Sequence, residues 1–216
     1  MIKIGVFDSG VGGKSVAKAI EKEIPEIEVI YKSDSENLPY GDKTPEQLLK
    51  LVIPKLRELE AEGCEAVVVA CNTVTTTIIK EVRERMKVPI VAVEPMVKPA
   101  SKMTKTNIIA VCATPTTLNS PRYRELLELN ARHITVLEPD CGDWVYLIES
   151  NSADYGAIQE RITEVCRQGA DVIVLGCTHY HWIEKEIKEI ADKYGAEVLQ
   201  PESALVAQLK RVLAQL

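Results

Sequence analysis

Short runs of apolar residues alternate along this chain with longer stretches in which apolar residues recur at helical spacing. A continuous apolar run bounded by polar turns is typical of a strand covered on both faces, as in a parallel sheet. The runs that fit this description are residues 2–7, 28–33, 66–71, 89–94, 107–112, 134–139, 171–176 and 197–201. The pattern therefore predicts an α/β fold with mostly parallel sheets.

The second half of the chain repeats the pattern of the first. A shift of 106 residues lays Cys71 on Cys177 and Asp8 on Thr114, and residues 63–95 match their counterparts without a gap. Identities in that stretch are near background, so two ordinary βα units that look alike remain the alternative to a duplication.

The repeat predicts two pseudo-symmetric α/β domains, residues 1–97 and 98–203, with a C-terminal helix at 204–216 packing back on the first. Ligands bind at the carboxyl ends of strands in open parallel sheets. We therefore expect the active site in the cleft between the domains.

Composition and charge narrow the class of partner. The net charge is −6 and the pI near 5.3, and Lys and Arg are scattered, which argues against a nucleic-acid partner. The longest apolar runs are about six residues and the first residues lack a signal-peptide pattern, so we expect a cytoplasmic protein without membrane contact. The six cysteines show no metal-ligand spacing, which predicts free thiols and no metal.

The stretch "FDSGVGGKS", residues 7–15, ends like a phosphate-binding loop. That motif requires Gly at the position of Asp8, where a carboxylate would repel phosphate. A strand followed by a tight glycine turn fits better and places Asp8 and Ser9 at the strand's carboxyl end. A P-loop-like nucleotide-binding protein, and a plain helix-capping role for Asp8 and Ser9, remain the alternatives.

Cys71 and Cys177 each follow an apolar run and open a helical stretch. A helix N-terminus lowers the pKa of a thiol, and His179 lies two residues after Cys177. Two thiols that face each other suit inversion of a stereocentre, because one removes a proton and the other returns one to the opposite face. A redox pair is the alternative. The remaining cysteines are expected to be structural: Cys64, Cys112, Cys141 and Cys166.

The segments "FDSGVGG", "LPYG", "VVACNT" and "LGCTHY" occur in that order, and with them the chain resembles the glutamate racemases of the aspartate/glutamate racemase superfamily over nearly its whole length. The resemblance implies a two-domain α/β isomerase that interconverts L- and D-glutamate without a cofactor or metal. It further implies that the D-glutamate supplies peptidoglycan for the cell wall, and it favours a homodimer.

The resemblance also implies roles for individual residues. Cys71 and Cys177 correspond to the two acid/base thiols, and Asp8 and His179 to their polar assistants. Glu149 is a further catalytic candidate, because "CGDWVYLIE" resembles the family's cysteine-to-glutamate segment. The substrate-contacting positions are Ser9, Pro39, Tyr40, Gly41, Asn72, Thr73, Thr114, Thr117 and Thr178. For Tyr40, packing at the rim of a loop is the alternative.

The chain departs from the family pattern at a few places. It is shorter between Glu149 and Asp171, and Ala113, Gly142 and His181 replace the usual Gly, Pro and Pro. These departures bear on substrate size and turnover more than on reaction type. A same-fold enzyme acting on aspartate or another small acid, including a decarboxylase, and a non-catalytic amino-acid-binding domain stay open as alternatives.

Overall fold

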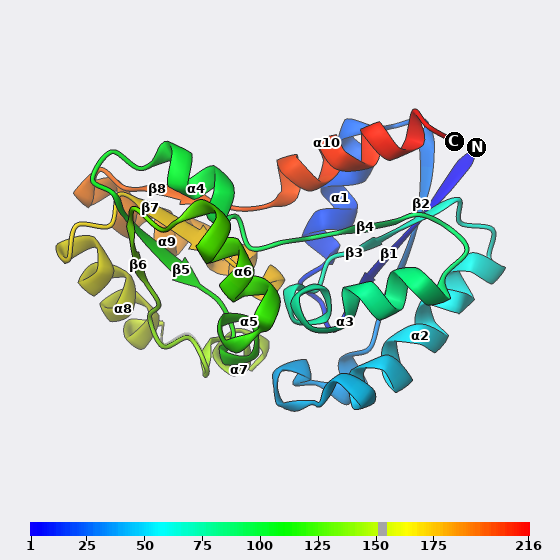
Figure 1. The fold of residues 1–216 in the computed structure, drawn as a ribbon, viewed down its shortest axis with the longest axis horizontal. Coiled ribbons are helices and arrows are strands. Elements are labelled where there is room, and N and C mark those ends of the chain that lie inside the picture. The colour runs from blue at the N-terminus through cyan, green and yellow to red at the C-terminus, as the bar shows by residue number, and fades with distance from the viewer. Residues whose placement is uncertain (151–154) are drawn as a thin grey trace. The chain divides into compact units, whose positions relative to one another are not determined.

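The computed structural model describes residues 1–150 and 155–216, so part of the expected shortening between Glu149 and Asp171 lies outside the described residues. The chain divides into two compact units (Figure 1). Unit 1 is Met1–Glu94 with Pro201–Leu216, and unit 2 is Pro95–Gln200.

Unit 1 is built on a four-stranded parallel sheet with the order β2-β1-β3-β4. Its strands are β1 (Ile2–Asp8), β2 (Ile27–Ser33), β3 (Ala66–Val69) and β4 (Ile90–Ala92). Its α-helices are α1 (Lys14–Glu23), α2 (Pro45–Ala61), α3 (Asn72–Arg85) and α10 (Glu202–Leu213), and the short 3-10 helices are η1 (Ser35–Asn37) and η2 (Tyr40–Asp42).

Both faces of this sheet are covered, as the unbroken apolar runs predict. Ile4 and Val6 of β1 pack in one apolar cluster with α1 and α10, whereas Phe7 packs in another with α2 and α3 (Figure 1). The side chains of a strand alternate between its faces, so β1 serves both clusters. All four residues of β3, between β1 and β4, are buried.

Unit 2 repeats the plan with the order β6-β5-β7-β8, all pairs parallel. Its strands are β5 (Ile108–Cys112), β6 (Thr135–Leu137), β7 (Val172–Leu175) and β8 (Glu197–Leu199). Its α-helices are α4 (Val97–Met103), α5 (Pro115–Asn119), α6 (Pro121–Asn130), α7 (Trp144–Glu149), α8 (Gly156–Arg167) and α9 (Glu184–Ala191), and its 3-10 helices are η3 (Thr178–Ile183) and η4 (Asp192–Tyr194).

The duplication is visible in the topology. Each strand of unit 2 occupies the place in its sheet that its counterpart occupies in unit 1, so β2-β1-β3-β4 becomes β6-β5-β7-β8. Every apolar run singled out in the sequence overlaps one of these strands. The predicted α/β class with parallel sheets is confirmed. No helix among residues 1–150 and 155–216 has the length and apolar character needed to cross a membrane.

The segment after Cys177 differs from the expectation. We expected an α-helix to start there, as α3 does after Cys71, but Thr178–Ile183 forms the 3-10 helix η3 and the α-helix starts only at Glu184. A 3-10 helix places residues three apart on the same side. Tyr180 and Ile183 have this spacing and are both buried, so core packing favours the tighter turn.

Candidate active site

The first candidate cluster lies at the carboxyl edge of the unit 1 sheet. β1 and β3 are parallel neighbours, so the residues that follow them meet at one edge: Asp8 ends β1, and Cys71 comes two residues after β3. The thiol of Cys71 donates a hydrogen bond to Ser9 Oγ at 3.4 Å. The structure therefore brings Asp8, Ser9 and Cys71 together, although Ser9 and Cys71 are 62 positions apart.

The glycine turn after β1 wraps around the Asp8 carboxylate. Asp8 Oδ2 accepts hydrogen bonds from the backbone N–H of Gly13 at 2.9 Å and of Gly10 at 3.3 Å. A Cβ at position 13 would lie 2.5 Å from Asp8 Cβ, so only glycine fits there. A phosphate-binding loop needs such N–H groups for its ligand. In this turn two of the backbone N–H groups already bind the Asp8 carboxylate, which argues against the nucleotide-binding alternative.

The N-cap of α1 is Gly13, which has no side chain that could cap the helix. Asp8 and Ser9 are therefore not its N-cap residues, but the Asp8 carboxylate accepts the N–H of Gly13, so a structural role for Asp8 at the start of α1 remains the alternative.

The Cys71 thiol contradicts the expected direction of its pKa shift. Burial, and next the negative charge of Asp8, raise the pKa of Cys71 to about 11. The Ser9 hydroxyl and the backbone N–H groups of Thr73 and Val74 lower the pKa, as expected of a helix N-terminus, but they do not outweigh the loss of water. Cys71 is therefore a neutral thiol near pH 7, ready to give a proton.

Asn72 is the first residue of α3, and its side chain is 4% exposed. Neither its amide oxygen nor its amide nitrogen has a hydrogen-bond partner within the described part of the chain. Leaving a buried polar group unpaired costs about 1–3 kcal/mol. Such a group next to Cys71 is suited to a polar ligand. Thr73, the next substrate-contact candidate, is also buried.

The loop after β2 carries Pro39, Tyr40 and Gly41. Tyr40 is 2% exposed and shares an apolar cluster with Cys71, so it does not pack at a rim. Its hydroxyl donates to Asp34 Oδ2 at 2.7 Å, and burial, with this contact, raises the pKa of Tyr40 far above its ordinary value. Asp34 was not among the site residues expected from the sequence. The signal that could have found it is weak: it lies six residues before Tyr40, on the same loop.

The second cluster lies in unit 2 and has different chemistry. Cys177 follows β7, and its Sγ lies 3.8 Å from His179 Nδ1. His179 Nε2 in turn lies 2.7 Å from Glu149 Oε1, at the end of α7. A carboxylate accepts hydrogen bonds, so Nε2 donates to Glu149, and in the neutral form of the imidazole Nδ1 is then the acceptor that faces the Cys177 thiol. These three residues can relay a proton away from Cys177.

The threonines expected to contact substrate in unit 2 lie on α5 and η3. Thr114 caps α5: its hydroxyl oxygen accepts the N–H of Thr117 at 3.4 Å and lies 3.1 Å from Thr117 Oγ1. Thr117 and Thr178 are buried. The candidate residues thus form one set in each unit: Asp8, Ser9, Pro39, Tyr40, Gly41, Cys71, Asn72 and Thr73 in unit 1, and Thr114, Thr117, Glu149, Cys177, Thr178 and His179 in unit 2.

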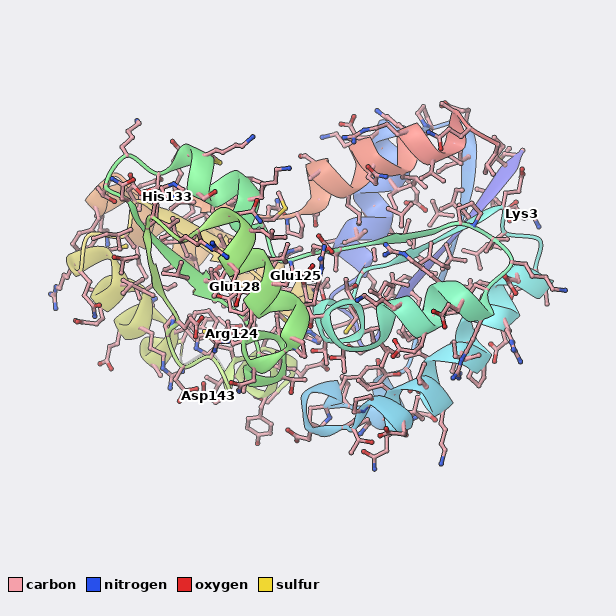
Figure 2. All side chains as sticks on the ribbon, viewed as in Figure 1. Lys3, Arg124, Glu125, Glu128, His133 and Asp143 are labelled. Atoms are coloured by element: carbon pink, nitrogen blue, oxygen red, sulfur yellow. The ribbon has the colours of Figure 1, made fainter. Side chains whose placement is uncertain are left out.

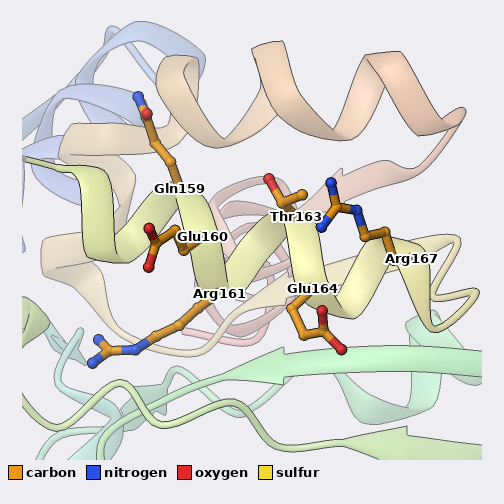
Figure 3. Close-up of a pocket in the computed structure, with 6 residues that line it drawn as sticks. All are labelled: Gln159, Glu160, Arg161, Thr163, Glu164 and Arg167. Atoms are coloured by element: carbon orange, nitrogen blue, oxygen red, sulfur yellow. The ribbon is translucent and has the colours of Figure 1, made fainter.

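Two surface features of the described residues lie away from these sets. A hollow along α8 is lined by mixed acidic, basic and polar side chains and contains none of the candidate residues (Figure 3). On α6, Arg124 lies beside Glu125 and Glu128, so charges of both signs alternate there (Figure 2). The four other cysteines are free thiols and buried. The described residues offer no group of three or more His, Cys, Asp or Glu that could hold a metal ion.

Comparison with known proteins agrees with the motifs. The family model Asp/Glu/Hydantoin racemase matches residues 13–209. The chain is 36% identical to the glutamate racemase of Methylococcus capsulatus, over 97% of this chain and 79% of the relative, and 38% identical to that of Pseudomonas aeruginosa, over 98% and 81%.

Among solved structures, the Escherichia coli glutamate racemase in complex with L-glutamate and the activator UDP-MurNAc-ala matches with a TM-score of 0.91 and 27% identity, covering 99% of this chain and 82% of the other. The order of motifs, the duplicated sheet and these matches lead to one conclusion: the chain belongs to the Asp/Glu/Hydantoin racemase family.

Proposed function

We propose that this protein interconverts L- and D-glutamate by moving the Cα proton between the thiols of Cys71 and Cys177. One observation carries the proposal: in each unit a cysteine follows the third strand, and each has its own groups for handling a proton. Relatives at 36% and 38% identity are named glutamate racemase, which supports glutamate as the substrate.

The resting protonation states suggest how one direction of the reaction begins. His179 Nδ1 accepts the proton of the Cys177 thiol, and the resulting thiolate removes the Cα proton of the substrate. The carbanion then takes the proton of the neutral Cys71 thiol on its opposite face. Cys71 is left as a thiolate, with Ser9 and the N–H groups of Thr73 and Val74 as its stabilising partners. The reverse direction starts from this state.

The proposal requires the two thiols to lie on opposite faces of one substrate molecule. The unpartnered amide of Asn72 and the hydroxyls of Thr73, Thr114, Thr117 and Thr178 supply hydrogen bonds for its carboxylates, as do backbone groups at the start of α3. Pro39, Tyr40 and Gly41 line the substrate from the loop after β2. Asp8 and Ser9 lie where they can pair with the ammonium group.

The same proposal extends to the setting of the enzyme. We place it in the cytoplasm as a homodimer, supplying D-glutamate for peptidoglycan, as the family resemblance implies. The two domains, residues 1–97 with 204–216 and residues 98–203, contribute one thiol each.

Exchange in D₂O tests the function directly. The chain is incubated with L-glutamate, and loss of the Cα proton is followed by NMR together with the decay of optical rotation. We expect both to proceed together. Exchange with aspartate and none with glutamate would transfer the mechanism to another substrate, and no exchange with either would overturn the proposal.

Single substitutions test the assignment of the two thiols. Cys71→Ser and Cys177→Ser should each abolish racemisation, since a hydroxyl is far less acidic than a thiol. Cys64→Ser is the matched control and should retain activity, because Cys64 is buried between α2 and β3, outside both candidate sets. Full racemisation by either of the first two variants would refute the two-thiol mechanism.

A further inference from the structure

Two adjacent residues of η3 contact opposite ends of the short helix α7. His179 binds Glu149, the last residue of α7, and Tyr180 contacts Trp144, the first. The rings of Trp144 and Tyr180 meet edge to face, with centroids 4.9 Å apart and planes inclined by 61°. Both side chains are fully buried, so this contact belongs to the core of unit 2.

The turn that opens α7 is held by the same tyrosine. The Tyr180 hydroxyl donates to the Cys141 carbonyl oxygen at 3.1 Å, and the backbone N–H of Trp144 donates to the same oxygen at 3.3 Å. From the other side, Arg161 of α8, labelled in Figure 3, forms an ion pair at 2.6 Å with Asp143, which is labelled in Figure 2 and lies just before α7. The start of α7 is therefore fixed by contacts from η3 and α8.

The far end of α7 is held differently. Trp144 is the one buried residue of this helix, whereas the Glu149 side chain is 31% exposed. The two residues are five positions apart, which at the helical rise is about 7–8 Å. A carboxylate at a partly solvated helix end keeps a 2.7 Å hydrogen bond to a buried imidazole only if the helix itself is well placed.

We propose that Tyr180, through its contacts with Cys141 and Trp144, is a positioning residue that holds α7 so that Glu149 accepts the Nε2 proton of His179. The inference rests on the proposed function for its consequence: Tyr180 supports proton transfer at Cys177 and leaves Cys71 unaffected. The residues that serve Cys71 come from other elements, β1 and α3.

NMR of the full-length protein tests the placement of Glu149 without any reaction. The Nε2 proton of His179 is protected from exchange with water by its hydrogen bond to Glu149. In Tyr180→Phe, which keeps the ring and removes the hydroxyl, we expect this proton to exchange about tenfold faster, which corresponds to about 1.4 kcal/mol in protection. The matched control is Tyr123→Phe, because Tyr123 is buried on the other face of the same sheet.

An elimination reaction that needs only one of the two thiols tests whether Tyr180 supports proton transfer at Cys177. Removal of the Cα proton of 3-chloroglutamate expels chloride with the C–Cl bonding electrons, so each enantiomer needs only the thiol on one face. The enantiomer that Cys177→Ser no longer attacks is the one served by Cys177. Tyr180→Phe should slow chloride release from that enantiomer about tenfold, as Glu149→Gln should, and leave the other within about twofold.

The outcomes separate the two proposals. Equal slowing of both enantiomers, or an unchanged Nε2 exchange rate in Tyr180→Phe, would overturn the positioning role. If the unsubstituted protein releases no chloride from either enantiomer, the proposed function fails, and the Nε2 exchange rates still decide whether Tyr180 places Glu149. Should Tyr180→Phe not fold, Trp144→Phe weakens the same ring contact and is expected to speed Nε2 exchange in the same way.

Discussion

The raised pKa of Cys71 should make the folded protein less stable at alkaline pH. Its pKa is raised from 9.0 to about 11 in the folded protein, because burial and the charge of Asp8 disfavour the thiolate. At pH 10 about one tenth of the folded molecules and about nine tenths of the unfolded ones carry a Cys71 thiolate. The unfolded state binds fewer protons, so stability falls as pH rises. The loss at pH 10 is about 1.4 kcal/mol, and it approaches about 2.7 kcal/mol once the pH exceeds 11.

Urea unfolding of the unsubstituted chain and of Cys71→Ser, each at pH 7 and pH 10, measures this loss. Other groups with raised pKa values, such as Cys166 and Tyr40, are present in both proteins and cancel in the comparison. The free energy of unfolding should fall by about 1.4 kcal/mol less in the variant between the two pH values. An identical fall in both proteins would mean that Cys71 ionises as an ordinary thiol, and its resting role as a proton donor would be refuted.

Two further substitutions test how the unit 1 site is built. Gly13→Ala should lower stability by about 1–3 kcal/mol in urea unfolding and reduce racemisation, because a Cβ placed 2.5 Å from Asp8 Cβ must displace that side chain; wild-type stability would show that the turn relaxes freely. Asn72→Ala should raise the KM for glutamate about tenfold while leaving the protein as stable or more so, because its amide is unpaired without ligand; an unchanged KM would exclude Asn72 from substrate binding.

The fold was predictable because its signal is local. A strand covered on both faces needs an unbroken apolar run, and each such run coincides with most of a strand. The repeat predicted two similar sheets, and equivalent strands take equivalent places in the strand order of each. The 3-10 helix after Cys177 was not predictable in this way, because the burial of Tyr180 and Ile183 depends on the core that they enter.

The candidate site was predictable where it follows strand ends. Asp8 ends a strand and Cys71 follows one, and parallel neighbours bring such positions together. The predicted direction of the Cys71 pKa shift was wrong, because the start of a helix can be recognised in a sequence, whereas the depth of burial of a thiol cannot. Asp34 was missed for the same reason, since it owes its importance to a hydrogen bond with the buried Tyr40.

The duplicated frame holds two different arrangements for proton transfer. Under the shift of 106 residues, Asp8 corresponds to Thr114 and Thr73 to His179, so the ionisable partner of each thiol occupies a different place in the repeat. In unit 1 burial, and next the charge of Asp8, keep the Cys71 thiol protonated, and in unit 2 an imidazole backed by Glu149 can take a proton from the Cys177 thiol. If both thiols had identical surroundings, both would have the same protonation state at rest. In the proposed mechanism, two unlike partners let one thiol start as the acid and the other as the base, which a two-base inversion requires in every turnover.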